Sequence, residues 1–173
     1  MSAFDRVRRA CWLGLVVMVL GATAVAHAQV SPSGLPDADK QQIKNYMLNE
    51  DIFNRLAAAT KEARAEGITP RAAPDASKVH SLDDLAAQAM AGDPRIPALV
   101  KKFGFTPREF MLANIALTNA ILAVQSRNDP ALASNLNPVW VNPENIRFID
   151  AHQAEVTALI QGGAERQPDG QAQ

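Results

Sequence analysis

A run of seventeen residues without a charged side chain, 110–126, constrains the fold of this chain more than any other feature. Three polar side chains in the run form one narrow stripe at helical spacing, with an asparagine nearly opposite: Asn114, Thr118 and Gln125, and then Asn119. A helix that is apolar on almost every side needs neighbours around it. We therefore expect an all-α fold, a small bundle of four to five helices around a central apolar helix at residues 106–127.

The start of this central helix carries three separate signals. Thr106 is a preferred N-cap residue, Pro107 takes the first helical position, and Glu109 completes a capping box. Phe105 and Phe110 occupy the two positions of a hydrophobic staple. Together they predict a sharply defined helix start.

Two other environments for this helix are open. A membrane span is disfavoured, because residues 110–124 reach only about 22 Å as a helix and include two asparagines. A subunit interface along one side remains an alternative, since a small bundle has few helices with which to surround such a segment. The interior of a bundle is the favoured interpretation.

Apolar periodicity and capping residues predict further helices before the central one. One long helix is expected over residues 36–66, with Gly67 as a left-handed stop. Ser81 caps a short helix, with Asp84 at the reciprocal capping position. Another short helix is expected over 97–102, because two lysines suit its C-terminus.

The C-terminal part combines an apolar strap with a last helix. Residues 128–142 are rich in Pro and Asn, yet they carry apolar anchors that a free linker would not need: Leu132, Leu136, Val139, Trp140 and Val141. Asn142 caps the last helix, Pro143 opens it, and Gly162-Gly163 ends it. We expect the strap to lie over the bundle.

The N-terminal residues have the order of a secretory signal. A start with three arginines precedes an apolar core, and Ala26-His27-Ala28 is an A-x-A site for signal peptidase. This order predicts cleavage after Ala28. The rival interpretation is an uncleaved anchor, but residues 10–26 reach only about 25 Å, less than the ~30 Å of a hydrocarbon core. The expected protein is exported, periplasmic or secreted, without a stable membrane span after cleavage.

Cleavage would leave one domain with flexible ends. We expect a signal peptide over 1–28, a flexible leader over 29–35, a helical domain over 36–163 and a disordered tail over 164–173. Loss of three arginines and one aspartate with the signal lowers the formal net charge from −1 to −3. A mildly acidic chain without basic runs is a poor candidate for nucleic-acid binding.

Few residues are available for catalysis or metal binding. Cys11 leaves with the signal, which excludes disulfides, thiolate zinc sites and cysteine nucleophiles from the mature chain. Of the histidines, only His80 and His152 remain. Asp150 and His152 lie about 200° apart around a helix, so they cannot form an acid–base pair. His152 and Glu155 alone are not a di-iron motif. We expect no enzyme, no metal and no cofactor.

Three side chains are candidate contacts for a ligand or partner. Tyr46 and Trp140 are the only Tyr and Trp of the mature chain, and large amphipathic side chains often anchor partners. The alternative is that Trp140 pins the strap while Tyr46 lies at the core edge with its hydroxyl in water. His152 is the third candidate, and the alternative for it is a border position with a hydrogen bond to a carbonyl group or water.

These observations favour a non-enzymatic function. The leading hypothesis is an exported small helical protein with a binding or structural role in a bacterial-type cell envelope, in contact with another protein or its own copy. The alternative is a carrier of an apolar small molecule, and the weakest alternative is an enzyme that uses His152. An exposed apolar patch near Trp140 would favour a partner, whereas a void beside Ile115, Ile121 and Leu122 would favour a carrier.

Overall fold

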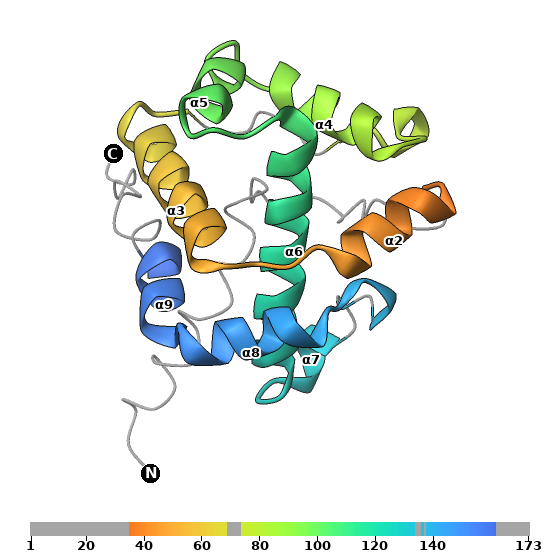
Figure 1. Ribbon diagram of the computed structural model, residues 1–173, viewed down its shortest axis with the longest axis vertical. Coiled ribbons are helices and arrows are strands. Elements are labelled where there is room, and N and C mark those ends of the chain that lie inside the picture. The colour runs from red at the N-terminus through yellow and green to blue at the C-terminus, as the bar shows by residue number, and fades with distance from the viewer. Residues whose placement is uncertain (1–34, 69–73, 134–135, 137, 162–173) are drawn as a thin grey trace, which may run out of the picture.

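The computed structural model describes residues 35–68, 74–133, 136 and 138–161, and within these ranges the chain is helical without β-strands (Figure 1). Eight α-helices and two short 3₁₀ helices follow in this order: α2 (Asp37–Asn45), α3 (Glu50–Ala65), η3 (Ala76–Lys78), α4 (Leu82–Ala91), α5 (Ile96–Lys102), α6 (Pro107–Ser126), α7 (Pro130–Ala133), η4 (Pro138–Trp140), α8 (Pro143–Ala151) and α9 (Gln153–Gln161). The all-α class is confirmed. The expected signal peptide, most of the leader and the tail lie outside the described residues.

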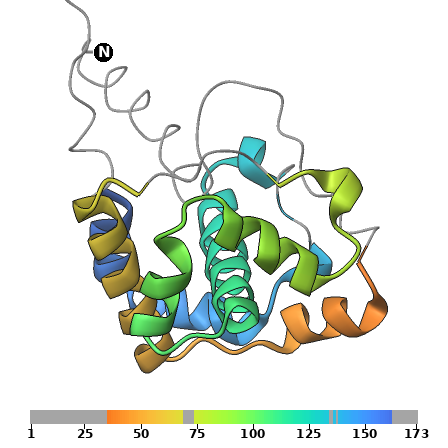
Figure 2. The same cartoon turned by 90° about the horizontal axis from the view of Figure 1, so that it is seen from above.

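α6 stands in the middle of the molecule, with other helices around it in both views (Figures 1 and 2). It contacts α2, α3, α4, α5, α7 and α8. Its predicted cap and staple are confirmed: the Thr106 hydroxyl accepts the N–H of Glu109 at 3.1 Å, and the rings of Phe105 and Phe110 lie 5.8 Å apart. Within the described ranges, none of the helices combines the length with the apolar character needed to span a membrane.

Two apolar clusters pack on α6, one toward α3 and α9 and the other toward α2 and α4. The buried members of the first cluster are Leu48, Phe53, Leu56, Met90, Val100, Phe105, Ala113, Ala116, Leu117, Ala120, Ile121, Ile149 and Val156. Those of the second cluster are Leu35, Ile43, Val79, Leu82, Leu85, Ala86, Met111 and Leu112. Leu35, expected at the end of a flexible leader, is therefore a packed residue.

The single helix predicted over residues 36–66 is wrong, because the chain forms α2 and α3 with a non-helical break at 46–49. The Asn49 side chain caps α3 by accepting the N–H of Ile52 at 2.8 Å, and two acidic residues follow in the first turn. The predicted left-handed stop is confirmed, because Gly67, two residues after the end of α3, has a φ of 63°. The apolar spacing thus concealed a second helix start inside the predicted helix.

Asn145 of α8 holds this break in place. Its side chain is almost fully buried, its Oδ1 accepts the N–H of Leu48 at 2.8 Å, and its Nδ2 donates to the carbonyl oxygen of Tyr46 at 2.9 Å. Asn142 donates to the same carbonyl oxygen at 3.3 Å. The backbone groups that a continuous helix would have paired internally are thus paired with side chains of α8.

The last predicted helix is also divided, into α8 and α9, at His152. The ring Nδ1 of His152 lies 2.8 Å from the carbonyl oxygen of Phe148, which also accepts the backbone N–H of His152 at 3.1 Å. A side chain inserted beside an i−4 carbonyl group is a recognised cause of a bend. The predicted cap is confirmed, since Asn142 Oδ1 accepts the N–H of Glu144 at 2.9 Å.

The predicted strap contains the short helices α7 and η4. Trp140 packs against the second cluster, as expected of a residue that pins the strap. Val139 is 59 % exposed, so its predicted role as an anchor is wrong. The two divided helices and α7 raise the number of α-helices above the four to five expected.

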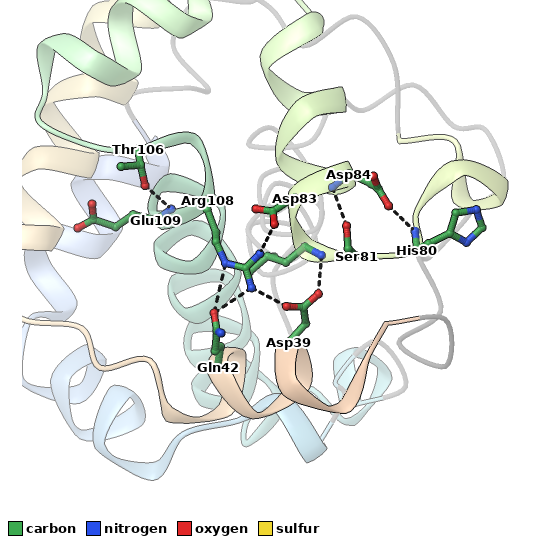
Figure 3. A network of polar contacts seen from close by, with 10 residues as sticks. Asp39, Gln42, His80, Ser81, Asp83, Asp84, Thr106, Arg108 and Glu109 are labelled. Atoms are coloured by element: carbon green, nitrogen blue, oxygen red, sulfur yellow. Dashed lines mark hydrogen bonds and ion pairs between the residues drawn. The ribbon is translucent and has the colours of Figure 1, made fainter.

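A polar network joins α2, α4 and α6 at the start of α6 (Figure 3). Arg108 donates to Asp39 at 2.5 Å and to Gln42 at 3.0 Å, and it pairs with Asp83 at 2.7 Å. The second carboxylate oxygen of Asp39, which is buried, accepts the N–H of Leu82 at 2.8 Å. Hydrogen bonds to Asp83 and Asp39 hold the pKa of the Arg108 guanidinium above its ordinary value.

The start of α4 lies in the same network. Ser81 caps α4 as predicted, because its hydroxyl accepts the N–H of Asp84 at 3.1 Å. The carboxylate of Asp84 accepts the N–H of His80 at 3.0 Å, whereas a capping box would place this bond on the N–H of Ser81. This backbone hydrogen bond, with that of the Ser81 side chain, lowers the pKa of Asp84.

The Asn145 contact can be tested by truncation. Asn145→Ala should lower the free energy of unfolding by about 2–4 kcal/mol, because the buried N–H of Leu48 loses its acceptor. Urea unfolding followed by circular dichroism measures this change. Asn54→Ala, at an exposed position of α3, is the matched control and should stay within about 0.5 kcal/mol of wild type. An Asn145→Ala protein as stable as the control would contradict the assigned role.

The Arg108 network can be tested by a double substitution. Arg108→Met should lower the free energy of unfolding by about 1–3 kcal/mol, because Asp39 keeps a buried charge without its cation. Adding Asp39→Asn should recover part of the loss, since the amide oxygen still accepts the N–H of Leu82. Arg147→Met, in the exposed pair with Glu144, is the control and should change stability by less than about 0.5 kcal/mol. Denaturant unfolding that shows no recovery in the double variant would refute the charge argument.

Candidate functional site

The three residues singled out in the sequence lie in two places. Tyr46 and Trp140 both pack against the second cluster, and Tyr46 also contacts the first. His152 lies beside Phe53 and Phe148 at the junction of α8 and α9, next to the first cluster. The fold therefore associates Tyr46 with Trp140 and leaves His152 in a different environment.

The hydroxyl group of Tyr46 is buried and has no hydrogen-bond partner among the described residues. The expectation of a hydroxyl in water is therefore wrong. Burial raises the pKa of Tyr46 to about 12; the neighbouring Glu109 carboxylate raises it as well, whereas the Arg55 guanidinium opposes them. The cause is physical: a phenolate is poorly solvated at this position, so the proton is held more tightly.

The indole of Trp140 has the same feature. Its Nε1 is buried and has no hydrogen-bond partner among the described residues. An unpaired buried donor costs about 1–3 kcal/mol, and such groups are few in native proteins. The two large amphipathic side chains of the second cluster thus each carry one unpaired polar atom, which a water molecule or a bound molecule could satisfy.

Two exposed apolar side chains flank these residues. Among the described residues, the large hydrophobic side chains that are exposed are Met47 and Val139, each 59 % exposed. Met47 follows Tyr46 in the α2–α3 break, and Val139 precedes Trp140 in η4. We call residues 46–47 and 138–141 together the junction surface.

The two segments of the junction surface are neighbours in space. η4 contacts α2, whose last residue directly precedes Tyr46. Asn142, directly after the second segment, donates to the carbonyl oxygen of Tyr46. The sequence interpretation missed this surface, because it expected a continuous helix through Met47 and counted Val139 among the anchors of the strap. The signal that could have revealed it is Asn49, a preferred N-cap residue that is followed by two acidic residues, because this order is typical of a helix start.

His152 is held by local contacts. Because a carbonyl oxygen only accepts, the Nδ1 of His152 carries the hydrogen that it donates to Phe148. The imidazole also stacks on the Phe148 ring, with centroids 4.1 Å apart and planes at 21°. The expectation of a border histidine bonded to a carbonyl group is confirmed.

One carboxylate lies near the second ring nitrogen of His152. Its Nε2 lies 3.6 Å from Oε1 of the exposed Glu50, which is beyond hydrogen-bond distance. Asp150 faces away and pairs with Arg127 at 2.9 Å. The described part of the chain contains no cluster of three or more His, Cys, Asp or Glu side chains that could hold a metal ion.

Tyr46 gives a direct spectroscopic test, because it is the only tyrosine of the chain. The absorbance of the phenolate near 295 nm should rise with a midpoint at about pH 12 in the folded protein, against about 10 for a free tyrosine. The folded-state pKa lies above the unfolded value, so the stability linked to Tyr46 is fully present below about pH 10 and is lost as the pH rises toward 12. Tyr46→Phe should lack the signal. A midpoint near 10 with the fold intact would show that the hydroxyl is in water.

No model of a protein family, no curated protein and no solved structure matches this chain. A functional proposal therefore rests on the chemistry of its own residues, and the exposed apolar side chains of the junction surface are the observation with the clearest functional meaning.

Proposed function

We propose that this protein is an exported, non-enzymatic binding or structural protein of the cell envelope, which contacts a protein partner or its own copy through the junction surface. The exposure of Met47 and Val139, on two segments that the α2–η4 contact brings near each other, carries this proposal. Exposed apolar groups that gather on one surface commonly mark interaction sites. The predicted signal peptide supports the export part of the proposal.

The composition of the junction surface suits a protein interface. Met and aromatic residues are enriched in interfaces relative to the rest of a protein surface. Lys44, Asn49 and Glu144, which lie near these segments in the sequence, are exposed and could form a polar rim. A partner that covers Met47 and Val139 would remove apolar area from water, worth roughly 25 cal/mol per Å² before the costs of association.

Contacts with the rest of the fold restrain both segments of this surface. Asn145 binds the backbone on both sides of Met47, at Tyr46 and at Leu48. Trp140 packs against the second cluster and thereby restrains the position of its neighbour Val139. A surface that is already ordered loses less conformational entropy when a partner binds.

A carrier of a small apolar molecule is the second candidate. The unpaired polar atoms of Tyr46 and Trp140 favour it, because both belong to side chains packed on the second cluster. A bound molecule with an oxygen acceptor would satisfy such donors. Native mass spectrometry of the purified protein separates the candidates, since a carrier would retain a small molecule, whereas self-association would double the mass.

Site-specific photo-crosslinking tests the partner proposal. The full chain with p-benzoylphenylalanine in place of Val139 should form discrete crosslinked species on irradiation of cells that export it. The matched control carries the same amino acid in place of Ala98, an exposed residue of α5, and should form none of these species. Gel mobility and mass spectrometry identify them as a dimer or as a complex with a second protein.

A second substitution ties the crosslinks to the apolar contact. Met47→Ser in the same chain should reduce the yield of the species several-fold, because it removes the larger of the two exposed side chains while the fold is retained. Identical species from positions 139 and 98, or a complete lack of crosslinks from position 139, would count against the proposal.

A further inference from the structure

The methionines of the described chain differ sharply in exposure. Met47 is 59 % exposed, whereas Met90 and Met111 are 9 % and 8 % exposed and belong to the first and second clusters. We propose that Met47 is a site of reversible oxidation by peroxides, and that its sulfoxide weakens binding at the junction surface. The effect on binding rests on the proposed function, but the oxidation itself does not.

The reaction needs only the thioether and the oxidant. A lone pair of the Met47 sulfur attacks one oxygen of hydrogen peroxide, the O–O bond breaks, and a new S–O bond forms. After proton transfer the second oxygen leaves as water. The sulfur loses two electrons and the peroxide gains them, and the product is methionine sulfoxide, which sulfoxide reductases can return to the thioether.

Burial protects the other two sulfur atoms. A peroxide molecule must reach the sulfur, and at Met90 and Met111 apolar neighbours occupy that space. A sulfoxide at either position would also place a strongly polar oxygen among the apolar side chains of its cluster, which is costly. Met47 has neither obstacle, because its side chain is largely in solvent.

The position of Met47 makes its oxidation a surface event. The backbone on both sides is bound by Asn145, and those hydrogen bonds do not involve the sulfur. The fold should therefore persist after oxidation. What changes is the surface: a flexible apolar group becomes a polar one, whose oxygen must lose its water when a partner covers it.

Peptide mapping after peroxide treatment tests the site directly. In the purified protein treated with dilute hydrogen peroxide, sulfoxide should form about ten-fold faster at Met47 than at Met90 or Met111. Far-UV circular dichroism should remain that of the untreated protein. Equal rates at the three positions, or faster oxidation of a buried methionine, would overturn the proposal.

The effect on binding is measured in the crosslinking experiment. Peroxide should reduce the crosslinks from position 139 several-fold in the wild-type background and leave them unchanged in a Met47→Leu background, which keeps an apolar side chain without sulfur. Met47→Gln, a polar side chain of similar length, should reproduce the loss without peroxide. Equal loss in the wild-type and Met47→Leu backgrounds would overturn the link to binding. If untreated protein gives no crosslinks, the proposed function fails, while the mapping still decides whether Met47 is the oxidation site.

Discussion

Exclusion of water from α6 is the constraint on which the rest of the structure depends. Nine of its residues are buried, and alanines are prominent among them: Ala113, Ala116, Ala120 and Ala123. Small side chains let neighbouring helices approach closely, while burial of the larger ones contributes the apolar free energy. The two clusters arise because α6 has apolar side chains in more directions than one neighbouring layer can cover.

Apolar burial has no direction, so polar contacts decide where the surrounding helices lie. Arg108 connects α6 to Asp39 of α2 and to Asp83 of α4. Asn145 connects α8 to the break between α2 and α3. Both contacts satisfy buried groups that would otherwise be costly, and each is specific to one arrangement of the chain.

The candidate surface is a product of that second contact. A continuous helix over residues 36–66 would have carried Met47 on its apolar face. The break turns the backbone at Tyr46 and Asn49 to extended conformations and leaves the Met47 side chain in solvent. The proposed binding role and the proposed oxidation site therefore both depend on hydrogen bonds made by a residue of α8.

Local signals allowed much of the fold to be predicted. The caps at Thr106, Ser81 and Asn142, and the stop at Gly67, depend on a few adjacent residues and appear as expected. Of the site residues, His152 was expected to bond a carbonyl group or water, and it contacts a carbonyl oxygen four residues earlier. The breaks were not foreseen, since neither contains glycine or proline. One needs a side chain 97 residues away, and the other needs a ring placed beside a carbonyl group.

The sequence by itself determined the helical class, the central position of α6 and the starts of α4, α6 and α8, because these follow from spacing and from contacts within one turn. Only the tertiary structure decided which polar tips are buried and which apolar side chains face solvent. Tyr46 and Val139 show this most plainly: the first has a buried hydroxyl and the second is exposed, against expectation in both cases. The physical reason is that burial depends on which distant segments pack beside a residue, and periodicity carries no information about them.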